Sequence, residues 1–125
     1  MIENLEKIKE ILSDLMSIEG VRSAIITSSD GLPIEIASLD NEFDADTVSA
    51  LVSTIKGAST SIFSECLGGR IKNVLIEGSS AKILIRPITN EYLLALVLDA
   101  HANLGMINIA ITKYLEDLKN LVSEQ

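Results

Sequence analysis

The sequence predicts one α+β domain in which a five-stranded antiparallel sheet carries helices on both faces, in the order α-β-β-α-β-β-β-α. The chain has 125 residues, the usual length of one domain, and neither an internal repeat nor a linker divides residues 1–125. Apolar residues recur with the helical period in three segments and form extended runs in five others. Short turns join most of these runs, which requires the neighbouring strands to be antiparallel.

The first helix is predicted near the N-terminus, where apolar residues recur every three or four positions and charged residues lie between them. It ends at Gly20, a residue that favours helix termination. The apolar positions of this helix are Leu5, Ile8, Leu12, Leu15 and Met16.

Residues 21–27 and 32–38 are rich in β-branched side chains and predict a hairpin, with Ser28, Ser29, Asp30 and Gly31 as its turn and Pro33 just after it. Glycine adopts positive φ freely and aspartate tolerates it, so Asp-Gly favours a tight turn. The two serines could instead be nucleophiles. That role would need a general base, and nothing in the sequence brings the single histidine to them.

The second helix is predicted to begin with Asp44 and Asp46, whose carboxylates complement the positive end of the helix dipole, and to run to about Ser64. Its predicted core stripe contains Val48, Leu51, Val52, Ile55, Ile62 and Phe63. Its opposite face carries small residues: Ala50, Ser53, Gly57, Ser61 and Ser64. Lys56 is the sole charge between Asp46 and Glu65, so we expect another surface to cover this face. A weakly polar exposed face is the alternative.

Three further strands are predicted at residues 71–77, 81–88 and 92–98, joined by short turns into a meander. The last of them has no polar residue after its tyrosine, so we expect it inside the sheet with helices above and below. Asn103 is the predicted cap of the final helix, and Gly105 is expected in the first turn of that helix. The apolar positions of that helix are Leu104, Ile107, Ile111, Tyr114, Leu115, Leu118 and Val122.

Composition excludes several classes of partner and compartment. A formal charge of −8 disfavours binding to nucleic acid and to anionic membranes, because both depend on lysine and arginine. The longest apolar run, residues 92–98, is far shorter than a membrane-spanning helix, so no membrane insertion is expected. The single Cys66 cannot form an internal disulfide and no secretory leader precedes the charged N-terminus, so we expect a cytoplasmic protein.

The sequence predicts no catalytic, cofactor or metal site. A phosphate-binding loop of the form G-x-x-x-x-G-K-[ST] is absent, so no nucleotide cofactor is expected. One histidine and one cysteine match no zinc spacing, and no calcium loop is present. A thiol enzyme that uses Cys66 and His101 remains a remote alternative, since a small buried cysteine and a loop histidine explain both residues.

The strings GVRSAIITSSDGLPI and LLALVLDAHANLGMINIAI, with the small-residue second helix between them, resemble the Roadblock/LC7 family, which includes dynein light chains and MglB-like proteins. The resemblance covers nearly the whole chain. It implies a homodimer, or a heterodimer with a paralogue, that binds and regulates a small Ras-like GTPase. A scaffold subunit of a motor or membrane-signalling complex, without a GTPase partner, is the alternative.

The same resemblance suggests which residues form the dimer. An unpaired strand edge and a charge-poor helix face also favour such an interface on physical grounds. The candidate interface residues are Ala50, Ser53, Thr54, Gly57 and Ser61 on the second helix and Ile71, Asn73 and Leu75 on the adjacent strand. Arg70 and Arg86 are the arginines that could act on a partner's GTP hydrolysis in trans.

Overall fold

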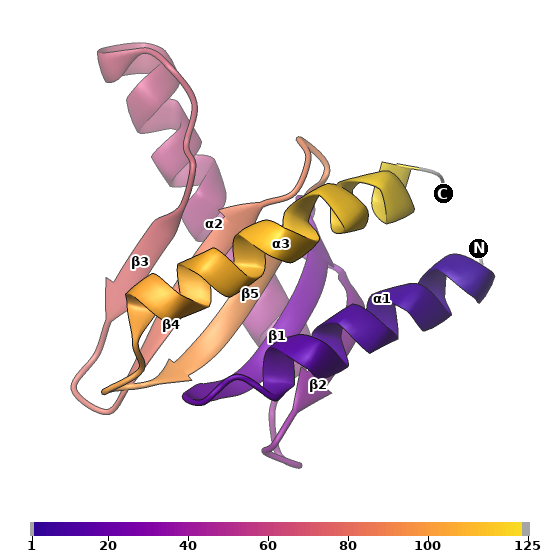
Figure 1. The fold of residues 1–125 in the computed structure, drawn as a ribbon. Helices are drawn as coiled ribbons and strands as arrows, with labels where there is room; N and C mark the ends of the chain where they lie inside the picture. The colour runs from indigo at the N-terminus through magenta and orange to yellow at the C-terminus, as the bar shows by residue number, and fades with distance from the viewer. Residues whose placement is uncertain (1, 124–125) are drawn as a thin grey trace.

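The computed structural model describes residues 2–123, which form one sheet between two helical layers (Figure 1). The side chains of residues 4–123 are described. The elements, in chain order, are α1 (Ile2–Met16), β1 (Val21–Ser28), β2 (Pro33–Ser38), α2 (Ala45–Ile62), a π-helical segment η1 (Phe63–Leu67), β3 (Val74–Glu77), β4 (Ala81–Pro87), β5 (Tyr92–Asp99) and α3 (Leu104–Ser123). This order confirms the predicted α-β-β-α-β-β-β-α sequence.

The five strands form one antiparallel sheet in the order β2-β1-β5-β4-β3. β5 lies in the middle, hydrogen-bonded to β1 on one side and to β4 on the other. Its residues from Leu93 to Leu96 are almost fully buried, and Leu98 is too. The prediction of a last strand inside the sheet, covered on both faces, is therefore confirmed.

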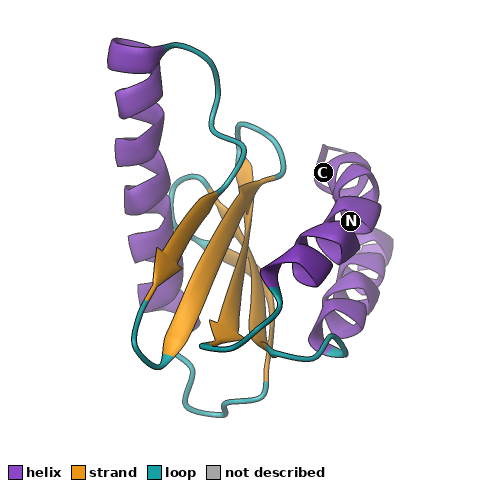
Figure 2. Ribbon diagram, turned by 60° about the vertical axis from the view of Figure 1, so that its left-hand side comes forward, coloured by secondary structure: helices purple, strands orange, loops and turns teal. Residues whose placement is uncertain are grey.

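The larger core lies between the sheet and the pair α1 and α3, which pack side by side and antiparallel (Figure 2). The side-chain amide of Asn4 donates to the carbonyl of Leu121 over 3.3 Å, and the Tyr114 hydroxyl donates to Asp14 over 3.3 Å. These two bonds tie the two ends of α1 to the C-terminal end and the middle of α3. Every second residue of β5 faces this core: Leu94, Leu96 and Leu98.

The smaller core lies on the other face of the sheet, under α2. Val52 of α2 packs there with Ile85, Leu93 and Ala95 of the sheet, and all four are at most 2% exposed. The prediction of helices on both faces is therefore confirmed. α2 covers only part of this face, because its C-terminal part extends past the end of the sheet (Figures 1 and 2).

The predicted core stripe of α2 is wrong at two positions. Val48, Val52 and Ile55 contact the smaller core, whereas Leu51 is 58% exposed and Ile62 is 53% exposed. Helical periodicity places all of these residues on one broad side but does not say where the sheet ends. Leu51 lies on the flank of the helix, and Ile62 belongs to the part that extends past the sheet.

The strand predicted from residue 71 begins only at Val74. In the ladder, Val74 pairs with Ile85, so continuing the register would place Lys72 opposite Pro87. Proline has no amide hydrogen and cannot extend a ladder. Residues 71–73 therefore form a loop.

The β1–β2 connection is a turn, as predicted. Hydrogen bonds of its serines hold this turn in place. Gly31 has a φ of +91°, and its amide donates to the carbonyl of Ser28 over 3.0 Å. The Ser28 hydroxyl accepts from the Leu32 amide over 3.1 Å, and the Ser29 hydroxyl donates to the carbonyl of Asn90 over 2.7 Å. Asp30 keeps a negative φ, so Gly31 alone supplies the left-handed conformation. Both hydroxyls serve the structure.

Candidate functional site

The two residues of the thiol-enzyme alternative lie in separate parts of the fold. The expectation of a buried Cys66 is wrong, because this residue is exposed in η1, between α2 and β3, where no other element of the described chain covers it. His101 is exposed in the β5–α3 loop, where it lines a shallow pocket with Ile18, Gly20 and Met106. Cys66 lines none of the described pockets. The structure therefore provides no pairing of this thiol with this imidazole.

Within residues 2–123, no three or more His, Cys, Asp or Glu side chains come together as metal ligands would. None of the helices in that range has the length and hydropathy of a membrane span.

The small-residue face of α2 has two different environments along its length. Ser53 and Ala50 lie against the hairpin turn, because a Cβ on Gly31 would be 3.0 Å from the Ser53 hydroxyl and 3.1 Å from the Ala50 Cα. Gly57 has no such neighbour within 4 Å, and it is exposed together with Ser61. Small residues at the start of α2 therefore let the turn approach the helix, while those further along remain open.

Two hydroxyls on this face are already hydrogen-bonded to their own helix. Ser53 donates to the carbonyl of Ala50 over 3.0 Å, and Thr54 donates to the same carbonyl over 2.9 Å. Burial of a polar group costs free energy unless it keeps a hydrogen bond. Another protein surface can cover these two hydroxyls without leaving them unpaired.

α2 and β3 also expose large apolar side chains, two of which, Leu51 and Ile62, the sequence interpretation assigned to the core. Leu51 and Ile62 lie on α2 and Ile76 lies on β3; we call these three residues the apolar flank. Ile76 is 38% exposed and pairs with Ile83, which contacts the smaller core, so its side chain is on the sheet face that α2 covers in part. The unusual width of the apolar stripe on α2 was the available sequence signal.

β3 is an edge strand, hydrogen-bonded to β4 alone. Leu75 is 39% exposed and faces the α1 and α3 layer, since it pairs with buried Leu84. Ile71 is half-buried and Asn73 is exposed, and both precede the strand. The predicted alternation along this edge is therefore wrong for Ile71 and Asn73, because Pro87 ends the ladder.

Both predicted helix starts are capped by hydrogen bonds. Asp44 accepts from the Thr47 amide over 3.1 Å and from the Thr47 hydroxyl over 2.7 Å, and these bonds hold the pKa of the Asp44 carboxyl below its ordinary value. Asn103 accepts from the Met106 amide over 3.1 Å, which confirms it as the cap of α3.

Arg70 and Arg86, the two arginines that could act on a partner's GTP hydrolysis, differ in how accessible their side chains are to a partner. Arg86 lies between the sheet and α3, where it donates to the Asn108 side chain over 3.1 Å and where burial lowers its pKa. Arg70 is exposed in the loop before β3. Arg70 alone of these two can reach a partner without moving a helix.

The matched protein family agrees with this architecture. Residues 7–98 match the family model of the Roadblock/LC7 domain. Among curated proteins, Uncharacterized protein MJ1340 of Methanocaldococcus jannaschii is 31% identical over 112 residues, which cover 90% of this chain and 96% of that protein. Uncharacterized protein MJ0310 of the same organism is 30% identical over the same shares.

Solved structures show the same fold at lower sequence identity. MglB of Myxococcus xanthus has a TM-score of 0.88 at 16% identity and covers 95% of this chain and 97% of that chain. The gliding protein MglB from Thermus thermophilus has a TM-score of 0.88 at 20% identity, with 98% and 93% covered. The Roadblock/LC7 domain from Streptomyces avermitilis has a TM-score of 0.83 at 21% identity, with 90% and 95% covered.

These structures define the fold class, an α+β domain with one antiparallel sheet between helices. The chain belongs to the Roadblock/LC7 family.

Proposed function

We propose that this protein is a non-catalytic cytoplasmic homodimer that binds and regulates a small Ras-like GTPase. The observation that carries the proposal is the uncovered surface on the α2 side. There the apolar flank, Leu51, Ile62 and Ile76, lies exposed on a chain whose formal charge is −8. Large apolar side chains left exposed on an otherwise charged surface favour contact with another protein.

A second copy of the chain is the partner that best fits two features of this side together. The unpaired edge of β3 is a template for another strand, and a two-fold axis would bring the same edge and the same helix from each copy together. The exposed Gly57 and the self-bonded hydroxyls of Ser53 and Thr54 allow close packing at low polar cost. A heterodimer with a paralogue would use the same surface.

The GTPase partner is proposed from membership of the Roadblock/LC7 family, and the fold shared with MglB proteins supports it. Regulation requires no nucleotide site on this chain, because the partner would supply it. Arg70 is exposed and could stabilise charge that develops on the partner's phosphates. In the alternative function, a scaffold subunit of a larger complex, the protein would form the same dimer but would have no GTPase partner.

Light scattering at tens of micromolar tests the dimer. The expected mass is that of two chains for the wild type and of one chain for Gly57→Glu. A Cβ at this position would meet no atom within 4 Å beyond its own turn of helix, and the site is exposed, so the monomer should stay folded. Lys113→Glu on α3 is a matched control, which should remain dimeric. A monomeric wild type would contradict the homodimer, and a dimeric Gly57→Glu variant would place the interface elsewhere.

Calorimetry with a small Ras-like GTPase encoded near the gene, loaded with GDP or with a non-hydrolysable GTP analogue, tests the partner. We expect binding that differs between the two nucleotide states. Equal binding, or none, would favour the scaffold alternative. The calorimetric result for the GTPase does not depend on the mass that light scattering gives for the dimer.

A further inference from the structure

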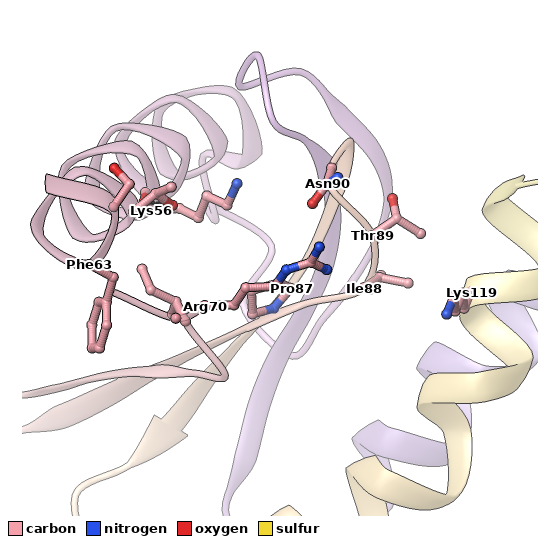
Figure 3. Close-up of a pocket in the computed structure, with 12 residues that line it drawn as sticks. Lys56, Phe63, Arg70, Pro87, Ile88, Thr89, Asn90 and Lys119 are labelled. Carbon is pink, nitrogen blue, oxygen red and sulfur yellow. Dashed lines mark hydrogen bonds between the residues drawn. The ribbon is translucent and has the colours of Figure 1, made fainter. Parts of the chain in front are cut away.

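A groove lies between the C-terminal part of α2, the loop before β3 and the β4–β5 turn (Figure 3). Its volume is about 530 Å³, which is within the range of small-ligand and peptide pockets. Phe63, Ile71, Pro87 and Ile88 supply apolar surface. Lys119 of α3 completes its far side, so four separate parts of the chain build the groove.

The lining carries the opposite charge to the rest of the protein. Lys56, Arg70 and Lys119 line the groove and no aspartate or glutamate does, although acidic residues outnumber basic residues by 18 to 10 in the chain. The ion pairs found among residues 2–123 are Lys9 with Glu6 and Arg22 with Asp99. In that range the three groove cations therefore have no carboxylate partner.

Main-chain groups along one wall are also unpaired. Residues 69–73 run without regular secondary structure from the end of η1 to β3, and within the described chain none of their amides or carbonyls has a hydrogen-bond partner. Gly69, Arg70 and Ile71 of this segment line the groove, and exposed extended segments accept added strands. This wall can pair with an extended peptide.

We propose that this groove binds an extended acidic peptide segment of a partner protein. Carboxylates on the peptide would pair with Lys56, Arg70 and Lys119, and its main chain would pair with residues 69–71. Figure 3 shows Lys56 and Lys119 on opposite sides of the turn, with Arg70 between them. Successive carboxylates of an extended chain can reach cations that come from α2, the loop before β3 and α3.

Other polyanions fit the groove less well. Single-stranded nucleic acid needs aromatic side chains on which bases stack, and Phe63 is the only aromatic residue of the lining. The net charge of −8 also disfavours a long phosphate backbone that extends beyond the groove. A short acidic segment fits inside the groove, so it contacts the positively charged lining and little of the acidic surface around it.

Fluorescence anisotropy of the full-length protein with a labelled peptide of alternating glutamate and threonine tests the proposal. Alternation places every second side chain of an extended peptide on one face. We expect saturable binding at low salt that weakens as salt rises, because exposed charge pairs are screened. Lys56→Glu and Arg70→Glu should each weaken binding by about tenfold or more, since each replaces an attraction with a repulsion.

Two controls separate the groove from general electrostatics. Lys113→Glu makes the same change in net charge on α3 outside the groove and should alter affinity by less than about twofold. A peptide of alternating glutamine and threonine should not bind. An equal loss with Lys113→Glu, or equal binding of the neutral peptide, would overturn the proposal.

Two further results would also overturn it. Displacement of the peptide by inorganic phosphate at a similar concentration would assign the groove to a small anion. Absence of peptide binding, together with a mass change in Lys56→Glu measured by light scattering, would show that a second copy covers the groove. The groove proposal can fail while the dimer and its GTPase partner stand, because those are measured without the peptide.

Discussion

Replacing Gly31 with alanine should destabilise the protein more than the same change at any exposed glycine. Gly31 is buried in the β1–β2 turn with a φ of +91°, a region that residues with a side chain rarely adopt. Its new Cβ would lie 3.0 Å from the Ser53 hydroxyl and 3.1 Å from the Ala50 Cα. One of these neighbours is helix backbone, so rotation of a side chain cannot relieve the contact.

The magnitude has two parts. The left-handed conformation costs an alanine roughly 1–2 kcal/mol. Forcing an extra methyl group into a packed site typically costs about 1–3 kcal/mol. The serine hydroxyl is itself hydrogen-bonded to the carbonyl of Ala50, so moving it breaks that bond. We expect a loss of about 2–5 kcal/mol in the free energy of unfolding for Gly31→Ala.

Substitutions at two other glycines measure the conformational cost and the packing cost separately. Gly69 has a φ of +82° with nothing within 4 Å, so Gly69→Ala should cost only the conformational part, roughly 1–2 kcal/mol. Gly57 is helical with nothing within 4 Å, so Gly57→Ala should stabilise the isolated chain by about 0.5–1 kcal/mol, the difference in helix propensity.

Urea denaturation followed by circular dichroism measures all three variants. The protein concentration must be the same and low throughout, because dimer formation adds to apparent stability. Equal losses for Gly31→Ala and Gly69→Ala would refute the close approach between the turn and α2. A loss for Gly57→Ala in dilute protein would show that the space beside this glycine is not open in the chain itself.

Three further predictions concern the cap of α2, a buried cation and the smaller core. The pKa of Asp44 lies below its ordinary value of 3.8, so its stabilising effect is present above that value and is lost as the pH falls through the lowered pKa; the difference in urea midpoint between wild type and Asp44→Asn should therefore be constant above about pH 5 and change as the pH falls below about 4. Asn108→Ala should cost about 1 kcal/mol, because Arg86 then loses its one side-chain acceptor, whereas adding Arg86→Met should recover most of that loss in the double variant; no recovery would mean that Asn108 acts by other contacts. Ile85→Ala should cost about 2–5 kcal/mol from the cavity it leaves, against less than about 0.5 kcal/mol for Ile109→Ala, which is 70% exposed, and similar losses in thermal or urea unfolding would contradict the burial pattern.

The features that the sequence by itself determined depend on neighbours along the chain. The Asp30-Gly31 turn and the Asn103 cap follow from backbone geometry over four or five residues. The place of β5 inside the sheet follows from an apolar run without a polar face. The β1–β2 hairpin and the β3–β4–β5 meander follow from short turns, but no local pattern joins the two, and the structure supplied the pairing of β1 with β5.

The candidate site could be predicted only in outline. The sequence indicated that one face of α2 is charge-poor, but the structure divides that face between the hairpin turn at Ser53 and open space at Gly57. It also exposes Leu51 and Ile62, which helical periodicity assigned to the core. Periodicity describes the angle of a residue around a helix and carries no information on where the underlying sheet ends.

Only the tertiary structure decided where β3 starts and where the positive charge gathers. Pro87 shortens β3 from across the ladder, an effect that no reading of residues 71–77 alone can detect. Lys56, Arg70 and Lys119 are far apart in the chain and each is an ordinary surface cation in its own segment. They line one groove because α2, the loop before β3 and α3 all approach the β4–β5 turn, and long-range packing, unlike a turn or a cap, is not determined by adjacent residues.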